Sequence, residues 1–157
     1  MKYRITILNH LSKRIVTKPL REAGEATRTR ENAQEGEISI LITTPEEIHE
    51  LNKQYRGMDK TTDVLSFPAP EFPPRQIGDV ALNFELAQKQ AKIRKVRPID
   101  EAAMLAVHGV LHLLGYEDET ESERAQMQSR MNEVMKICGL PTEDNWTSLP
   151  YPEESTL

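Results

Sequence analysis

The sequence has little cysteine, and this scarcity limits both its chemistry and its setting. Cys138 is the single cysteine among 157 residues, so an internal disulfide and a four-cysteine zinc site are both excluded. A chain without disulfides fits a reducing compartment, and we therefore expect a cytoplasmic location. The N-terminus, MKYRITILNH, has no apolar core of the length that a secretory signal contains.

The chain also lacks a membrane-spanning run, and its C-terminal part lacks positive charge. The longest candidate run, residues 102–114, contains two histidines and is shorter than the about 20 residues that a bilayer requires. Residues 101–157 hold 3 Lys or Arg and 11 Asp or Glu. A polyanion partner would therefore contact the earlier part of the chain. A solvated helix face is the simpler interpretation of the basic residues that cluster there: Lys89, Lys92, Arg94, Lys95 and Arg97.

Hydropathy patterns predict an α+β chain in which short strands alternate with helices. Strand-forming stretches lie at residues 3–8, 38–43, 62–67 and 77–82. Helical patterns cover residues 11–34 loosely, then 45–57, 84–94, 98–114 and 119–138. With no repeat or linker, we expect a single domain over residues 1–157, with a small mixed four-stranded sheet packed with helices. The tail after about residue 141 is expected to be loosely held.

Two histidines four residues apart mark the helix predicted over residues 98–114. His108 and His112 leave the same face of this helix, among neighbours that are apolar nearly all round. Buried imidazoles need polar partners, and one metal ion would satisfy both while keeping them neutral. Gly115 then favours a left-handed helix end, after which the chain reverses and returns carboxylates toward the pair. A structural or coincidental histidine pair is the alternative.

The spacing H-x3-H-x2-G-x2-D, which places Asp118 third, resembles the metal-binding pattern of metzincin peptidases. Glu117 and Glu119 are the alternative third ligands. Metzincins carry a general-base glutamate directly after the first histidine, where this chain has Gly109. The sequence therefore argues against ordinary proteolysis, unless another carboxylate acts as the base.

Two blocks of the sequence are similar to the YbeY-type endoribonucleases, which are also called ribosomal RNA maturation factors. HGVLHLLGYED, residues 108–118, resembles the family signature H-G-x-L-H-L-x-G-Y-D-H. It departs from the signature at Glu117, which replaces an aspartate, and at Asp118, where the family has a third histidine. LNKQYRGMDKTTDVLSFP, residues 51–68, resembles L-N-x-x-(Y/W)-R-x-x-D-x-x-T-D-V-L-S-F-P, and an IGDVAL strand follows. In all, the resemblance covers about residues 38–140.

The resemblance implies a zincin-like helix and a cytoplasmic, metal-dependent endoribonuclease that hydrolyses RNA in ribosomal RNA maturation and ribosome quality control. It implies one zinc ion held by His108, His112 and Asp118, although a carboxylate shifts the relative preference toward Mn²⁺ or Mg²⁺. Expected partners are ribosomal RNA and the ribosome or its small-subunit proteins, with neither a membrane nor DNA among them. The alternatives are a metal-dependent peptidase or amidase, and a non-enzymatic ribosome-associated factor with a structural metal.

Several other residues have a functional and a structural interpretation. The family's conserved arginine falls on Arg56. This residue suits a phosphate clamp, because its guanidinium can bind two phosphate oxygens. The alternative is a structural pair with Asp59. Asp63 either orients a ligand histidine or caps a strand. Tyr116 either lies over the metal or simply packs. Glu85 is a weaker candidate for the general base.

Overall fold

Strands and helices alternate through the part of the chain that the computed structural model describes, which is residues 3–33, 36–69, 76–144 and 146. The strands are β1 (Tyr3–Asn9), β2 (Gly36–Thr43), β3 (Val64–Pro68) and β4 (Gln76–Asn83). The helices are α1 (Lys18–Arg30), α2 (Pro45–Arg56), α3 (Phe84–Arg94), α4 (Pro98–Leu113) and α5 (Glu121–Ile137). The strand bounds lie within two residues of the predicted ones.

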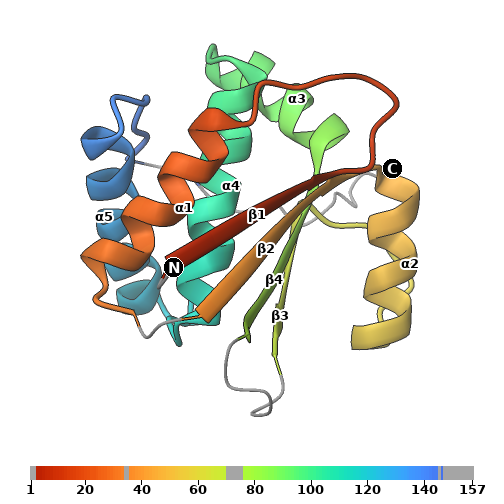
Figure 1. The fold of residues 1–157 in the computed structure, drawn as a ribbon, viewed down its shortest axis with the longest axis horizontal. Helices are drawn as coiled ribbons and strands as arrows, with labels where there is room; N and C mark the ends of the chain where they lie inside the picture. Colours follow the sequence, from red (N-terminus) through yellow and green to blue (C-terminus); the bar gives the residue numbers. More distant parts are fainter. Residues whose placement is uncertain (1–2, 34–35, 70–75, 145, 147–157) are drawn as a thin grey trace.

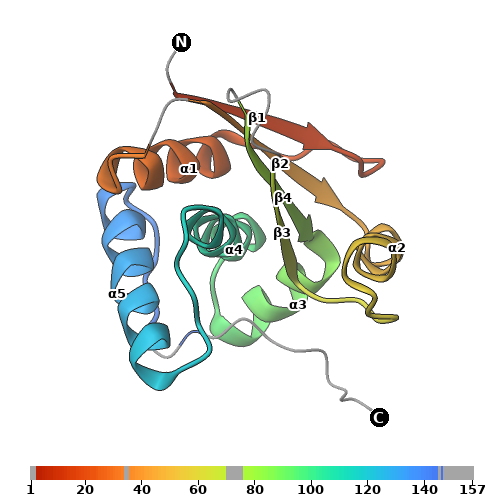
Figure 2. The same ribbon diagram turned by 90° about the horizontal axis from the view of Figure 1, so that it is seen from below.

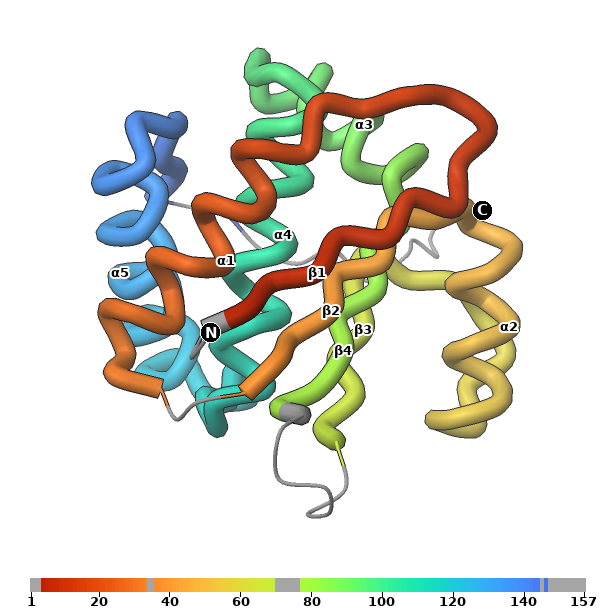
Figure 3. The backbone as a smooth tube through the Cα atoms, viewed as in Figure 1, coloured from red at the N-terminus to blue at the C-terminus, as the bar shows by residue number. Residues whose placement is uncertain are grey.

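The strands form one mixed sheet in the order β1-β2-β4-β3. β1 pairs with β2 and β2 with β4 in parallel, whereas β3 pairs antiparallel with β4 and lies at an edge. The chain leaves β1, returns along α1 and enters β2, which is the crossover that a parallel pair requires (Figure 3). The predicted α+β class and small mixed sheet are therefore confirmed.

Helix α4 lies at the centre of the helical layer. It contacts α1, α3 and α5 as well as β3 and β4, while α2 lies on the opposite face of the sheet (Figures 1 and 2). Its residues are buried continuously from Asp100 to Leu111, which agrees with the apolar composition of this stretch. Within the described ranges, no helix combines the length and the apolar character needed to cross a membrane.

Gly109 lets α4 approach the sheet closely. A Cβ atom at this position would lie 2.6 Å from Val80 Cγ1 and 3.2 Å from Ser66 Oγ. The Ser66 hydroxyl donates a hydrogen bond to the Gly109 carbonyl over 2.9 Å. The glycine beside His108 therefore places the histidine-bearing helix directly against β3 and β4.

The segment after α5 is attached to the helices through Glu143 and Trp146. Gln128 Nε2 donates to the Glu143 carbonyl over 2.7 Å, and the Glu143 N–H donates to Asn132 Oδ1 over 3.1 Å. Trp146 is 5% exposed and donates its indole N–H to Glu101 Oε2 over 2.8 Å. These contacts involve the described residues 143 and 146, and the loose hold expected for the tail after about residue 141 stays a prediction. Residues 145 and 147–157 lie outside the described residues.

Candidate metal centre

The C-terminal half of α4 and the turn after it bring together the three side chains that were predicted to bind a metal ion. His108 Nε2 and His112 Nε2 lie 3.1 Å apart, and Asp118 Oδ2 lies 3.4 Å from each of them. Among the described residues, these three alone form a group of His, Cys, Asp or Glu side chains that could hold a metal ion. Asp118, rather than Glu117 or Glu119, is thus the carboxylate that faces the histidines.

The three donor atoms fit a tetrahedral divalent cation. They form a nearly equilateral triangle with sides of 3.1, 3.4 and 3.4 Å. Zinc binds imidazole nitrogen and carboxylate oxygen at about 2.0–2.2 Å, and tetrahedral ligands at that radius lie about 3.3–3.6 Å apart. Three protein ligands of this type leave one position open, as in catalytic zinc sites. The residues present therefore match the metal that the family resemblance implies.

Gly115 ends α4 and turns the chain back toward its own last turn. Its φ angle is +103°, a conformation that favours glycine. The Gly115 N–H donates to the His112 carbonyl and the Tyr116 N–H to the Leu111 carbonyl, each over 3.0 Å. This pair of hydrogen bonds is the Schellman arrangement, so the local sequence reverses the chain as predicted.

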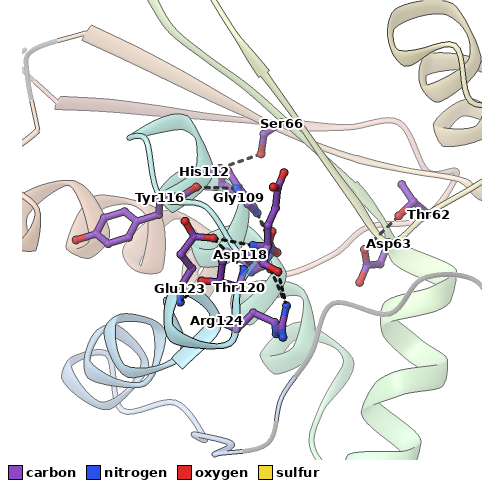
Figure 4. Close-up of polar contacts among 12 residues, drawn as sticks. Thr62, Asp63, Ser66, Gly109, His112, Tyr116, Asp118, Thr120, Glu123 and Arg124 are labelled. Atoms are coloured by element: carbon purple, nitrogen blue, oxygen red, sulfur yellow. Dashed lines mark hydrogen bonds and ion pairs between the residues drawn. The ribbon is translucent and has the colours of Figure 1, made fainter. Parts of the chain in front are cut away.

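The loop after Gly115 is held in place by the start of α5. Arg124 Nη1 donates to the backbone carbonyls of Asp118 and Glu119 over 3.3 and 3.0 Å (Figure 4). Thr120 caps α5, accepting from the Glu123 N–H over 3.0 Å, and the Glu123 carboxylate accepts from the Thr120 N–H over 2.9 Å. This capping box sets where the loop ends, and the arginine fixes the backbone that carries Asp118.

Tyr116 orients His112 through its backbone and not through its ring. His112 Nδ1 lies 2.9 Å from the Tyr116 carbonyl, which can only accept, so Nδ1 carries the proton. His112 Nε2 is then the unprotonated nitrogen that faces the other ligands. The Tyr116 ring points away, and its hydroxyl donates to Glu31 Oε1 over 2.7 Å (Figure 4).

The histidines keep the Asp118 side chain charged. The hydrogen bond from His108, helped by the nearby His112, lowers the pKa of Asp118 from 3.8 to about 2, against a smaller opposing effect of burial. Asp118 is therefore a carboxylate at neutral pH, which is the form that binds a metal ion.

His108 and Asp118 open onto a cavity of about 650 Å³. The cavity is also lined by residues of α5 and of the segment after it, including Met127, Gln128 and Trp146. Arg124 is the one arginine or lysine among the described residues that line it. The cavity gives a substrate room to reach the ligand group.

Arg56 lies outside the ligand group. Its exposed guanidinium donates from Nη2 to the Ser66 carbonyl over 2.7 Å, on the edge strand β3. Asp59, its alternative partner from the sequence, instead lies 2.6 Å from His49 Nε2. Since the Ser66 hydroxyl bonds to Gly109, Arg56 is connected to the histidine helix through β3.

The structure does not bring Asp63 or Glu85 to the histidines. Asp63 is buried beside Thr62 just before β3, and Figure 4 shows it apart from His112 and Asp118. Glu85 is exposed on α3 and pairs with Lys89 over 3.6 Å. A role for Asp63 in orienting a ligand, or for Glu85 as a base, stays a prediction.

The predicted basic cluster does not form one solvent-facing patch. Arg94 has a side chain that is 14% exposed, and its Nη1 lies 3.7 Å from the buried Glu101. Arg97 is exposed but binds Asp100 over 2.8 Å. Sequence reasoning missed both this inward-facing arginine and the contacts of Trp146, because no local pattern marks a contact between distant segments.

The chain is similar over most of its length to known proteins of one family. Residues 4–139 match the family model described as Endoribonuclease YbeY. A protein of Chloroflexus aurantiacus named Endoribonuclease YbeY is 44% identical over 133 residues, which cover 77% of this chain and 86% of that protein. One of the same name from Persephonella marina is 42% identical over 139 residues, covering 85% and 91%. The solution structure of TM1509 from Thermotoga maritima is similar with a TM-score of 0.58 and 26% identity, over 85% of this chain and 90% of that one.

Proposed function

Because this chain belongs to the YbeY endoribonuclease family and is a hydrolase that acts on RNA, we propose that it cleaves RNA at a metal ion held by His108, His112 and Asp118. The observation that carries this assignment is the triangle of donor atoms, 3.1 to 3.4 Å apart, at the wall of a cavity of about 650 Å³. The triangle supplies the ligands, and the cavity supplies the space for a phosphodiester.

The chain's own residues prepare this site. When bound, a divalent ion would act as a Lewis acid on a phosphoryl oxygen and acidify a coordinated water. The Tyr116 carbonyl keeps His112 in the tautomer that offers Nε2, and the histidines keep Asp118 ionised. Arg124 adds the positive charge on the cavity wall, next to the backbone of Asp118.

We assign Arg56 to the RNA backbone at the edge of β3. One of its nitrogens, Nη2, holds the Ser66 carbonyl, and the exposed guanidinium has further N–H groups that suit phosphate oxygens. A strand bound there would pass the β3 edge on its way to the metal. The clamp role thus places Arg56 at a distance from the reacting phosphate.

We favour zinc as the ion, ribosomal RNA as the substrate and the cytoplasm as the location. Two imidazoles and a carboxylate form a known catalytic zinc set. Asp118 adds a negative charge where the family has a third imidazole, which raises the relative affinity for Mn²⁺ and Mg²⁺. The ribosome or its small-subunit proteins would present the RNA, in line with the family resemblance.

Gly109 weakens the peptidase alternative. A peptidase of the metzincin type needs a glutamate at this position, and a Cβ there would lie 2.6 Å from the fully buried Val80. A glutamate at this point could not be accommodated without moving α4 away from the sheet. RNA hydrolysis needs no residue at this position.

Metal analysis combined with cleavage assays tests the proposal. The purified chain should hold one divalent ion, cleave RNA but not peptides, lose cleavage with a chelator and regain it with metal. Asp118→Ala should lose metal and activity, whereas Glu119→Ala, which removes a neighbouring carboxylate outside the ligand group, should keep both. Metal stoichiometry and affinity that are unchanged in Asp118→Ala would reject the ligand set.

A further inference from the structure

The two ligand histidines are supported in different ways. His112 donates from Nδ1 to the Tyr116 carbonyl over 2.9 Å, which fixes its ring. His108 is 5% exposed, and its Nδ1 has no hydrogen-bond partner in the part of the chain that the structure describes. Metal-binding histidines almost always hold their second nitrogen with such a partner, since the bond sets ring orientation. Within the described part of the chain, a contact of another kind must therefore orient His108.

Aromatic packing is the contact that His108 does have. Its ring centre lies 5.2 Å from that of Trp146, with the ring planes at 53°. The His112 ring also packs edge-to-face against the His108 ring, with 4.6 Å between the two ring centres. His108 is thus enclosed by its fellow ligand and by Trp146, the single tryptophan of the chain.

Trp146 is itself held firmly. Its indole N–H donates over 2.8 Å to Oε2 of Glu101, which is buried on α4. The Arg94 guanidinium carbon lies 5.3 Å from the centre of the indole ring, within the range of a cation–π contact. A ring anchored from two elements can restrict the rotation of the histidine against which it packs.

We propose that Trp146 is a positioning residue of the metal centre, whose indole fixes the orientation of His108 in place of a hydrogen bond. Trp146 thereby supports His108 from within the wall of the cavity that both residues line. This inference rests on the metal site proposed above, and it assigns a role to a residue outside the two sequence blocks of the family.

Zinc affinity of the full-length chain, measured by chelator competition, tests the role. Trp146→Ala should weaken Zn²⁺ binding about tenfold, the lower end of the effect of losing a partner that orients a ligand. Trp146→Phe keeps a ring against His108 and should retain most of the affinity. Met135→Ala removes a similarly buried side chain that does not line the cavity, so it should lose stability but not affinity.

The intrinsic fluorescence of Trp146 gives a second measurement, which is made on the unmodified chain. Co²⁺, which quenches a neighbouring indole, should reduce the emission in a saturable way that ends at one equivalent. His112→Ala, which keeps the tryptophan, should lose this saturable step.

The outcomes separate this inference from the proposed function. Parental Zn²⁺ affinity in Trp146→Ala, or emission that stays constant while one equivalent of Co²⁺ binds, would overturn the role of Trp146 and leave the metal site standing. If the unmodified chain bound no stoichiometric metal, the metal site and this inference would both be wrong.

Discussion

Replacing Gly109 by alanine tests how closely α4 must pack on the sheet. The new Cβ would lie 2.6 Å from Val80 Cγ1 and 3.2 Å from its Cγ2, so rotating the valine exchanges one contact for another. Val80 is fully buried and β-branched, and it cannot move aside freely. Overpacking typically costs about 1–3 kcal/mol, and the gain of about 1 kcal/mol from alanine's helix propensity offsets part of it. We expect a net loss of up to about 2 kcal/mol in the free energy of unfolding.

Urea unfolding of the metal-free protein measures this change, with Gly24→Ala as the matched control. Gly24 is also helical, but its Cβ would meet nothing closer than Ile5 Cδ1 at 3.2 Å and Cγ1 at 3.4 Å, with Ile40 Cδ1 at 3.5 Å. The control should be neutral or slightly stabilising. The Tm of Gly109→Ala should fall by up to roughly 8 °C, since 1 kcal/mol corresponds to about 2–4 °C in a domain of this size.

A double-mutant cycle with Val80→Ala isolates the contact. Removing the valine methyl groups should make the alanine at position 109 less costly, with a coupling energy of about 0.5–3 kcal/mol. The close approach would be refuted if Gly109→Ala lost the same stability in the parent and in Val80→Ala, or if Gly109→Ala were more stable than its parent. The single variant should also bind metal more weakly, because His108 moves with the helix.

Four further results are expected. The depressed pKa of Asp118 stabilises the fold above about pH 4, and this contribution is lost as the pH falls toward 2. In the metal-free protein, the urea midpoint of Asp118→Asn should therefore change less with pH in this window than that of the parent. Parallel curves for the two proteins would contradict this. Thr120→Ala, which removes the cap of α5, should cost about 1 kcal/mol by urea unfolding, and an unchanged midpoint would count against the cap. Arg56→Ala should stay folded, as measured by circular dichroism, and keep its metal, but it should cleave RNA more slowly than the parent. Arg56→Lys should recover part of the rate. Cleavage by Arg56→Ala at the parental rate would reject the clamp. Zn²⁺ at 100 times its Kd should stabilise the parent by about 2.7 kcal/mol but not His112→Ala, and equal shifts in a thermal melt would reject the site.

Local sequence was sufficient for the histidine pair and the turn after it. A spacing of four residues places His108 and His112 on one face of any helix, and Gly115 supplies the conformation that ends it. The helix was predicted for its apolar residues, and it proved to be buried from Asp100 to Leu111. These features depend on residues within a few positions of one another, so periodicity and turn chemistry can find them.

Tertiary structure decided which residues meet across long distances in the chain. Whether Glu117, Asp118 or Glu119 faces the histidines depends on the course of the loop, which the start of α5 holds through Arg124. The contact between Trp146 and His108 likewise exists only because the chain folds back past α5. Local propensity carries no information about such meetings, since they follow from the packing of whole helices against one sheet. The sequence by itself therefore determined the helix, its two imidazoles and the family, and the packing determined the position of Asp118 and the surroundings of His108.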